Sequence, residues 1–547
     1  MWARNTVFIG LILAGLSAVG ASLLREDRLA ENIRRLQVPA ASEIQAVVEQ
    51  VDSEFQREWH DDGLQTAPLA SDRTIMRRLS LGLAGTVPSL EELRMMDAVP
   101  DTDRLALWTE YLLADRRSSD YIAERLARSL VATDRGPFLV FRRRRFVIWL
   151  SDQLAMNVPY DQLQRKIVTG KGLWTDSPSV NFFTATITTD KGNQPDPVVV
   201  TGRLCRALLA VRMDCLQCHD DVLGQVTLGT AEQPREGTQR DFHRLAAYFS
   251  DVDNSLLGIQ DKDQEYRYQF LGEEDHEVVL PAVPFLESLA NGKGNRRQQL
   301  ARWMTHRQNR PFARAAVNRT WALLFGRPLV DPIDDIPLHG PFPAGMEILA
   351  SDFIEHRFDL RRLVRVISSI KVYQLDSRAD FEVTEQHELA WAVFPLTRLR
   401  PEQVAGSISQ ATSLSTINAE AHFIRKVTSF GDQSGFLQRF GDKGKDEFQP
   451  RAGTVAQRLL MMNGMMVKLR TNHSPLFNGP TRIAQLVENE SQAVEAAYLC
   501  VLSRLPSQTE RDHFEQRLAE YPRNEYSAVM EDMFWTLINS TEFSWNH

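Results

Sequence analysis

The sequence predicts a mainly α protein in which two helical lobes are joined by a small β-containing segment. Apolar residues recur at helical spacing along most of the chain, and Ser, Thr, Asp or Asn often precedes these runs as helices prefer. Alternating, strand-like sequence gathers in residues 251–290. With 547 residues, 43% apolar and 24% charged, the chain has the composition of an ordinary globular protein with two or three domains.

Residues 1–26 are predicted to be a signal peptide or an N-terminal membrane anchor. Arg4 precedes an apolar run from Val7 to Leu24, and Arg25 closes the run. This length approaches a short membrane span, and Val19-Gly20-Ala21 offers a site for cleavage. A buried helix is the alternative. We expect the body of the protein outside the cytoplasm, in the periplasm or cell envelope, anchored in the inner membrane if the segment is retained.

Residues 27–250 are predicted to form the first helical domain. Ser71 is placed to cap a helix with Ile75 and Leu79 on its buried face, and Ser89 has Glu92 at capping-box spacing. A polar loop is expected between residues 220 and 237. Further helices are predicted at Arg28–Phe55, Leu105–Leu113, Asp120–Leu130, Phe141–Met156, Tyr160–Val168, Val198–Val211 and Asp241–Phe249.

Residues 251–290 are predicted to be the β-containing linker, and residues 291–547 the second helical domain. Alternation in Tyr266–Leu271 and the apolar run Val278–Val283 indicate short strands. Helices are then expected at Arg297–Thr305, Ala313–Leu324, Glu347–Glu355, Leu360–Ser369, Pro401–Ala411 and Val455–Met462, and again after Pro480.

The sharpest chemical feature is the sequence Cys215-Leu216-Gln217-Cys218-His219. A c-type haem is attached through thioethers to two cysteines at this spacing, and the following histidine is the proximal iron ligand. The motif predicts covalent haem c on Cys215 and Cys218 with His219 as ligand, in a protein that exchanges electrons with a redox partner. No Met lies between Met213 and Met304, so His243 is the nearest candidate for the sixth ligand.

Other interpretations of the two cysteines remain open. They are compatible with a disulfide that fixes a loop in an envelope interaction protein. They are also compatible with half of a zinc or iron site that includes His219 and one more ligand, such as Cys205 or His243. A thioredoxin-like pair would need a βαβ pattern, which the neighbouring sequence lacks.

Charge limits the partners that we expect. A net charge of -8 argues against nucleic acid, which needs a basic face. Arg142–Arg145 is the strongest charge run and could bind an acidic polysaccharide, although a solvated helix start is the more ordinary explanation. Asp334-Asp335 with Asn318 and Arg319 is a second polar group with an ordinary structural alternative. The sequence has no Gly-x-Ser-x-Gly elbow of the kind that marks one class of hydrolase. Whether the protein is an enzyme is left open by the sequence.

An ordered set of short motifs runs from about residue 45 to residue 547. They include Arg77-Arg78-Leu79-Ser80-Leu81, Thr201-Gly202-Arg203, the Cys215–Asp220 segment, Asn309-Arg310-Pro311-Phe312, Phe325-Gly326-Arg327 and Met462-Asn463-Gly464. Through them the chain resembles a planctomycete family of exported proteins that pairs a cytochrome-c-associated domain with a second domain. Both are domains of unknown function, fifteen-forty-nine and fifteen-fifty-three. The resemblance implies an association with exported redox or polysaccharide systems and no established activity.

The sequence departs from that family in two places. Relatives continue the motif as Cys-His-Asp-His-Pro, whereas this chain has Asp221 in place of the second histidine. Relatives also have Ser-His-Pro in a later loop, where this chain has Ala344-Gly345-Met346. Asp221 remains a candidate ligand for a hard or borderline metal, and Met346 for a soft axial position.

Overall fold

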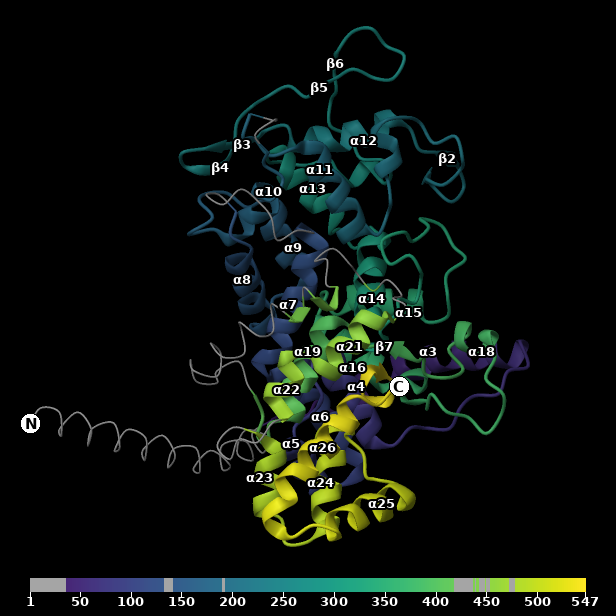
Figure 1. Ribbon diagram of the computed structural model, residues 1–547. Coiled ribbons are helices and arrows are strands. Elements are labelled where there is room, and N and C mark those ends of the chain that lie inside the picture. Colours follow the sequence, from purple (N-terminus) through teal and green to yellow (C-terminus); the bar gives the residue numbers. More distant parts are fainter. Residues whose placement is uncertain are drawn as a thin grey trace, which may run out of the picture.

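The computed structural model describes residues 36–131, 141–188, 192–417, 436–437, 439–441, 448, 453–471 and 478–547. As predicted, the described chain is mainly α, and its strands are confined to short pairs (Figure 1). The signal or anchor segment, residues 1–26, lies outside the described residues. Among the described helices, none is both long enough and apolar enough to cross a membrane.

Two helices of the first half begin where the sequence predicts capping. Ser71 accepts a hydrogen bond from the Thr74 amide, and Ser89 and Glu92 form a capping box. The described helices are α3 (Ser42–Asp61), α4 (Asp72–Ala84), α5 (Leu90–Asp97), α6 (Asp101–Ala114), α7 (Arg116–Val131), α8 (Arg143–Ala155), α9 (Tyr160–Val168), α10 (Asn181–Thr184), α11 (Pro197–Leu204) and α12 (Gln239–Ala246).

The second half is helical as well. Its described helices are α13 (Arg296–Met304), α14 (Arg310–Phe325), α15 (Met346–Glu355), α16 (Leu360–Ser369), α17 (Lys371–Gln374), α18 (Glu385–Leu389), α19 (Pro401–Ala411), α21 (Val455–Asn463), α22 (Met465–Thr471), α23 (Gly479–Leu486), α24 (Glu490–Leu502), α25 (Gln508–Ala519) and α26 (Tyr526–Ile538).

Strands in the described residues form two-stranded antiparallel pairs. The pairs β3–β4 (Val252–Ser255, Gly258–Asp261) and β5–β6 (Arg267–Tyr268, Glu277–Val278) lie inside the predicted β-containing segment. The pair β1–β2 (Thr227–Gly229, Pro234–Glu236) occupies the expected polar loop. The pair β7–β8 (Thr397–Arg398, Trp545–Asn546) joins segments far apart in the sequence.

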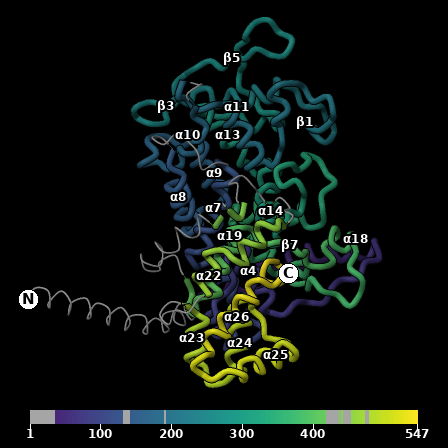
Figure 2. Tube along the Cα trace, in the orientation of Figure 1, coloured from purple at the N-terminus to yellow at the C-terminus, as the bar shows by residue number. Residues whose placement is uncertain are grey.

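The two halves of the chain share one hydrophobic core. Helix α14 packs on α4, α13 on α9, and both α15 and α16 on α3. Figure 2 shows the blue α7 and the green α19 together in the middle of the molecule, where Arg125 of α7 and Glu402 of α19 form a buried ion pair at 3.0 Å. Segments of both predicted domains therefore cover each other's apolar faces.

Two predicted helices have different bounds in the structure. The helix expected at Arg28–Phe55 is α3, which begins only at Ser42, because residues 36–41 are not helical. The helix expected at Val198–Val211 is α11 followed by a π-helical turn, Cys205–Leu209, which ends at Ala210 in a left-handed conformation with φ 50°. This turn ends the helix and leads the chain to the Cys215 motif.

Candidate functional site

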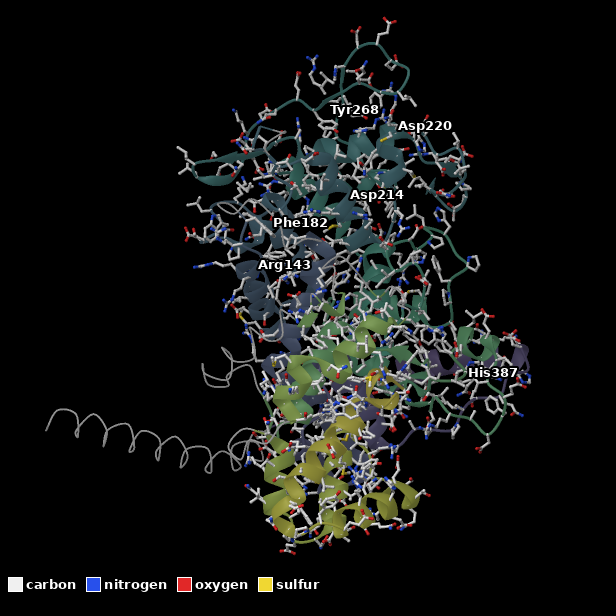
Figure 3. The ribbon with its side chains drawn as sticks, viewed as in Figure 1. Arg143, Phe182, Asp214, Asp220, Tyr268 and His387 are labelled. Atoms are coloured by element: carbon white, nitrogen blue, oxygen red, sulfur yellow. The ribbon has the colours of Figure 1, made fainter. Side chains whose placement is uncertain are left out.

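The Cys215–His219 motif lies at the end of the molecule that carries the strands β1 to β6 (Figure 1). Its first residues form a 3₁₀ turn, η4 (Asp214–Gln217), which packs against α12. Figure 3 shows Asp214, Asp220 and Tyr268 at this end of the molecule, with Tyr268 contributed by β5. The motif is thus supported by a helix and by the β-containing segment.

One backbone carbonyl fixes the motif in place. The Gln217 oxygen accepts hydrogen bonds from His243 Nε2 at 3.0 Å, Gln239 Nε2 at 3.1 Å and the Tyr268 hydroxyl at 3.1 Å. Within the turn, the Cys218 amide donates to the Cys215 carbonyl at 3.3 Å. Because Gln217 stands between the two cysteines, these three donors hold both cysteines in a defined backbone conformation.

His243 is one of the residues that support the motif. A carbonyl only accepts hydrogen bonds, so Nε2 carries the proton, and Nδ1 accepts from the Tyr266 hydroxyl at 2.8 Å. The ring is buried and stacks on Tyr268, with the ring centroids 3.5 Å apart. Burial lowers the pKa of His243, while the Gln217 carbonyl opposes that shift. Both ring nitrogens are occupied, so neither presents a lone pair to a metal in this conformation.

Asp221 organises the loop that follows the motif. Its carboxylate accepts the Leu223 amide at 3.0 Å and the Val226 amide at 2.6 Å, and its own amide donates to the Gly237 carbonyl at 2.9 Å. The backbone donors, led by Val226, lower the pKa of this carboxyl. Both carboxylate oxygens of Asp221 are therefore engaged in closing a loop.

The side chains of the motif itself are left accessible. All four cysteines of the chain are free thiols; Cys205 and Cys500 are buried, Cys215 is partly buried and Cys218 is exposed. Burial, reinforced by the negative charge of Asp221, raises the pKa of the Cys215 thiol. His219 is exposed, and its Nδ1 lies 2.7 Å from the Asp220 carbonyl oxygen. This contact places the proton on Nδ1 and leaves the lone pair of Nε2 available.

This arrangement bears on each interpretation of the motif. A raised thiol pKa is unfavourable for a thiolate nucleophile of the thioredoxin kind. Across the part of the chain that the structure describes, no three His, Cys, Asp or Glu side chains are arranged to hold a metal ion. Covalent haem needs two reachable thiols and a histidine whose other ring nitrogen is held, and Cys215, Cys218 and His219 fit those requirements.

The other sequence candidates are placed in structural contacts. Arg143 forms an ion pair with Glu124 at 2.8 Å, and Arg142 lies over the Trp174 ring. Asp334 accepts from Arg212 at 2.5 Å. Within the run Arg142–Arg145, at least one cation is therefore already neutralised by the protein.

The remaining candidates also make structural contacts. Asn318 pairs with the backbone of Val330, and Arg319 donates to two carbonyls at the π-helical turn. Gly345 has φ 77° and donates its amide to Glu54. Met346 is fully buried in the hydrophobic core at the start of α15. Its thioether is therefore part of the packing between α15 and its neighbours.

Sequence reasoning missed the residues that support the motif. Gln239 and Tyr268 donate to it from 22 and 51 residues away in the chain, and Tyr266 acts through its hydrogen bond to His243. One signal was present, because Tyr266, Tyr268 and Phe270 alternate and so point to one face of an extended segment. That face packs on His243, whose ring contacts all three aromatic rings.

Comparisons with known proteins identify both halves of the chain. Residues 50–254 match the family model described as a protein of unknown function, DUF1549, and residues 296–518 match the model described as a protein of unknown function, DUF1553. These are the two domains that the sequence motifs indicated, in the predicted order. No curated protein and no solved structure matches the chain.

Proposed function

We propose that this chain, which contains a DUF1549 domain followed by a DUF1553 domain, is an extracytoplasmic electron-transfer protein with one covalent haem c on Cys215 and Cys218. The observation that carries the proposal is the hydrogen bond of the His219 ring. Its Nδ1 is held by the Asp220 carbonyl at 2.7 Å, which orients the ring and leaves Nε2 as the ligand atom. Metal-ligating histidines commonly use their second nitrogen in this way.

The loop around the motif supplies a suitable surface. Val222, Leu223 and Leu271 are 78%, 74% and 75% exposed, although each is apolar. The first two are three and four residues after His219 in the chain, and the Leu271 amide is held by Gln239, which also donates to the Gln217 carbonyl. A porphyrin is a large apolar ring, and exposed apolar side chains next to its attachment site offer it a favourable contact.

Each residue of the motif has a defined task in this proposal. Cys215 and Cys218 hold the group covalently, and Gln217 fixes the spacing of the two thiols through its three hydrogen bonds. His219 would provide a nitrogen ligand to the iron through Nε2. The haem, when bound, supplies reversible one-electron chemistry. His243 serves as a positioning residue for the turn, because both of its nitrogens are already engaged.

The proposal is tested by expressing the chain with its N-terminal segment in a host that matures c-type cytochromes. We expect a Soret band and bound haem in the wild-type protein, and loss of both in the double variant C215S/C218S. The matched control is Cys500→Ala, which removes a buried cysteine far from the motif in sequence and should retain the haem.

Three results would contradict the proposal. Tightly bound zinc or iron without haem would indicate a non-haem metal protein. A disulfide between Cys215 and Cys218, with neither haem nor metal, would indicate an interaction protein of the cell envelope. Free thiols with no bound group after maturation would remove the basis for an electron-transfer role. Elemental analysis and intact mass distinguish the three outcomes.

A further inference from the structure

A cleft of about 380 Å³ lies where the two family domains meet, well separated in sequence from the cysteine motif. Its walls come from α9 of the first domain, from the segment between α13 and α14, and from the turn that follows α15 in the second domain. Helices α9 and α13 pack against each other, so the cleft is built on a fixed interface. Its polar lining includes Asp161, Arg165, Thr305, His306, Arg307 and Arg357.

The lining is strongly basic for a protein with a net charge of -8. Three guanidinium groups face one carboxylate. Arg165 lies 3.4 Å from Asp161 and donates from Nε to the Thr305 hydroxyl at 2.6 Å, so this arginine is held by the protein itself. The charges of Arg165 and Asp161 cancel each other, so the positive charges of the other two arginines remain.

Those two arginines have no competing partner. Within the described residues, neither the Arg307 nor the Arg357 guanidinium donates a hydrogen bond or forms an ion pair, and Arg307 reaches Asp161 only as a more distant charge. Both residues are exposed, so their guanidinium groups are accessible to a ligand. His306 adds a donor, because its Nδ1 accepts the Gln308 amide at 3.2 Å and its proton is therefore on Nε2.

The backbone fixes the position from which Arg357 extends. Arg357 and Phe358 both have φ 58°, a left-handed conformation that is uncommon for residues other than glycine and asparagine. The turn is secured from both sides: the Phe358 amide donates to the Phe353 carbonyl at 2.7 Å, and the Phe358 carbonyl accepts the Tyr160 amide at 3.0 Å. Because Phe358 is buried, Arg357 is displayed on a rigid turn.

We propose that this cleft binds an oxyanion, with Arg307 and Arg357 as its principal ligands and His306 as an additional donor. Guanidinium groups recognise sulfate, phosphate and carboxylate through charge-assisted, often paired, hydrogen bonds. The cleft's volume admits a small tetrahedral anion or one anionic sugar unit. Inorganic sulfate and a sulfate ester on a saccharide both present this chemistry, and they serve as probes for a free anion and for an anion carried on a sugar. This site is separate from the Arg142–Arg145 run and does not depend on haem.

Isothermal titration calorimetry of the full chain tests the site with three probes: sodium sulfate, a sulfated disaccharide and the same disaccharide without sulfate. The informative variants are Arg307→Gln and Arg357→Asn. Asparagine tolerates the left-handed backbone, so the second variant removes the guanidinium while keeping the turn. Arg517→Gln is the matched control, since Arg517 is a comparably exposed arginine on the distant helix α25. Thermal unfolding of each variant checks that it is folded.

We expect sulfate-dependent binding in the wild type and in Arg517→Gln, weakened about ten-fold or more by each cleft variant and reduced by added salt. Tighter binding of the sulfated disaccharide than of sulfate would assign the site to a saccharide, and equal or weaker binding would assign it to the free anion. The proposal is overturned if sulfate and the sulfated disaccharide both fail to bind. It is also overturned if the folded cleft variants bind as well as the wild type.

Discussion

The centre of the molecule and the cysteine motif use polar groups in opposite ways. In the centre, the buried guanidinium of Arg78 makes hydrogen bonds within the protein. Its Nε donates to the His547 carbonyl, and its Nη1 donates to the carbonyls of Tyr373 and Leu375. At the motif, the polar groups that support the turn are hydrogen-bonded to one another, whereas the thiols of Cys215 and Cys218 remain free. Nη2 of Arg78 is buried without a hydrogen-bond partner, so the polar contacts that hold the fold are those of Nε and Nη1. An accessible group without a partner, such as the Cys218 thiol, is instead available for chemistry.

The largest effect is expected for Arg78→Met. Burial lowers the pKa of Arg78 to about 10, but the arginine still joins α4 to the second half of the chain through three carbonyls. Removing it leaves buried acceptors without donors, which costs about 3–5 kcal/mol of unfolding free energy. Urea unfolding measures the change.

The control for that variant is Arg73→Met on the same helix. Arg73 forms one ion pair with Asp97 at 2.8 Å, and both side chains are about one-third exposed. Exposed pairs of this kind contribute less than about 1 kcal/mol. Equal destabilisation by the two variants would contradict the distinction between a buried, hydrogen-bonded central arginine and an ordinary surface arginine.

His243→Phe is expected to have a smaller effect. Phenylalanine keeps the aromatic contact with Tyr268 but loses the hydrogen bonds to the Gln217 carbonyl and the Tyr266 hydroxyl. We expect a loss of about 1–3 kcal/mol of unfolding free energy and faster alkylation of the partly buried Cys215. The variant His243→Gln restores an amide donor and should recover part of both properties. Unchanged Cys215 reactivity in His243→Phe would show that the histidine does not position the turn.

Asp221 should make the stability of the motif loop depend on pH. Its pKa is lowered in the folded protein from an ordinary value of 3.8, chiefly by the Val226 amide. The stabilisation is therefore fully present above pH 3.8 and is lost as the pH falls through the lower, folded-state pKa. We expect Asp221→Asn to unfold at a lower temperature than the wild type at pH 6, with the difference shrinking below pH 4. A difference that does not vary with pH would contradict the stated role of the carboxylate.

The smallest effects concern thiol reactivity in the native protein. We expect alkylation in the order Cys218, then Cys215, with Cys205 and Cys500 unreactive until the protein unfolds. Exposure decreases in that order, and burial raises the pKa of the last three thiols. Mass spectrometry of a timed reaction with the haem-free protein gives the order. Rapid labelling of Cys205 or Cys500 would show that the core opens more readily than the packing implies.

The sequence was informative where the physics is local. Ser71, Ser89 and Glu92 predicted two helix starts because capping involves residues only three apart. The Cys215–Cys218–His219 spacing predicted the candidate haem site for the same reason. Non-local contacts escaped prediction: the turn is fixed by Gln239, His243 and Tyr268, and Asp221 is engaged by backbone amides that no side-chain pattern reveals. The shared core of the two halves depends on long-range packing of the same kind.

The most direct test of the proposed haem site is the mass of a single peptide. Trypsin cleavage after Arg212 and Arg235 releases residues 213–235, which contain both Cys215 and Cys218 and neither of the other cysteines. From protein exported by a host with cytochrome c maturation, we predict this peptide with one haem attached to both thiols. Recovery of the same peptide wholly unmodified or with an internal disulfide, from a host that attaches haem to a control cytochrome, would contradict the central claim.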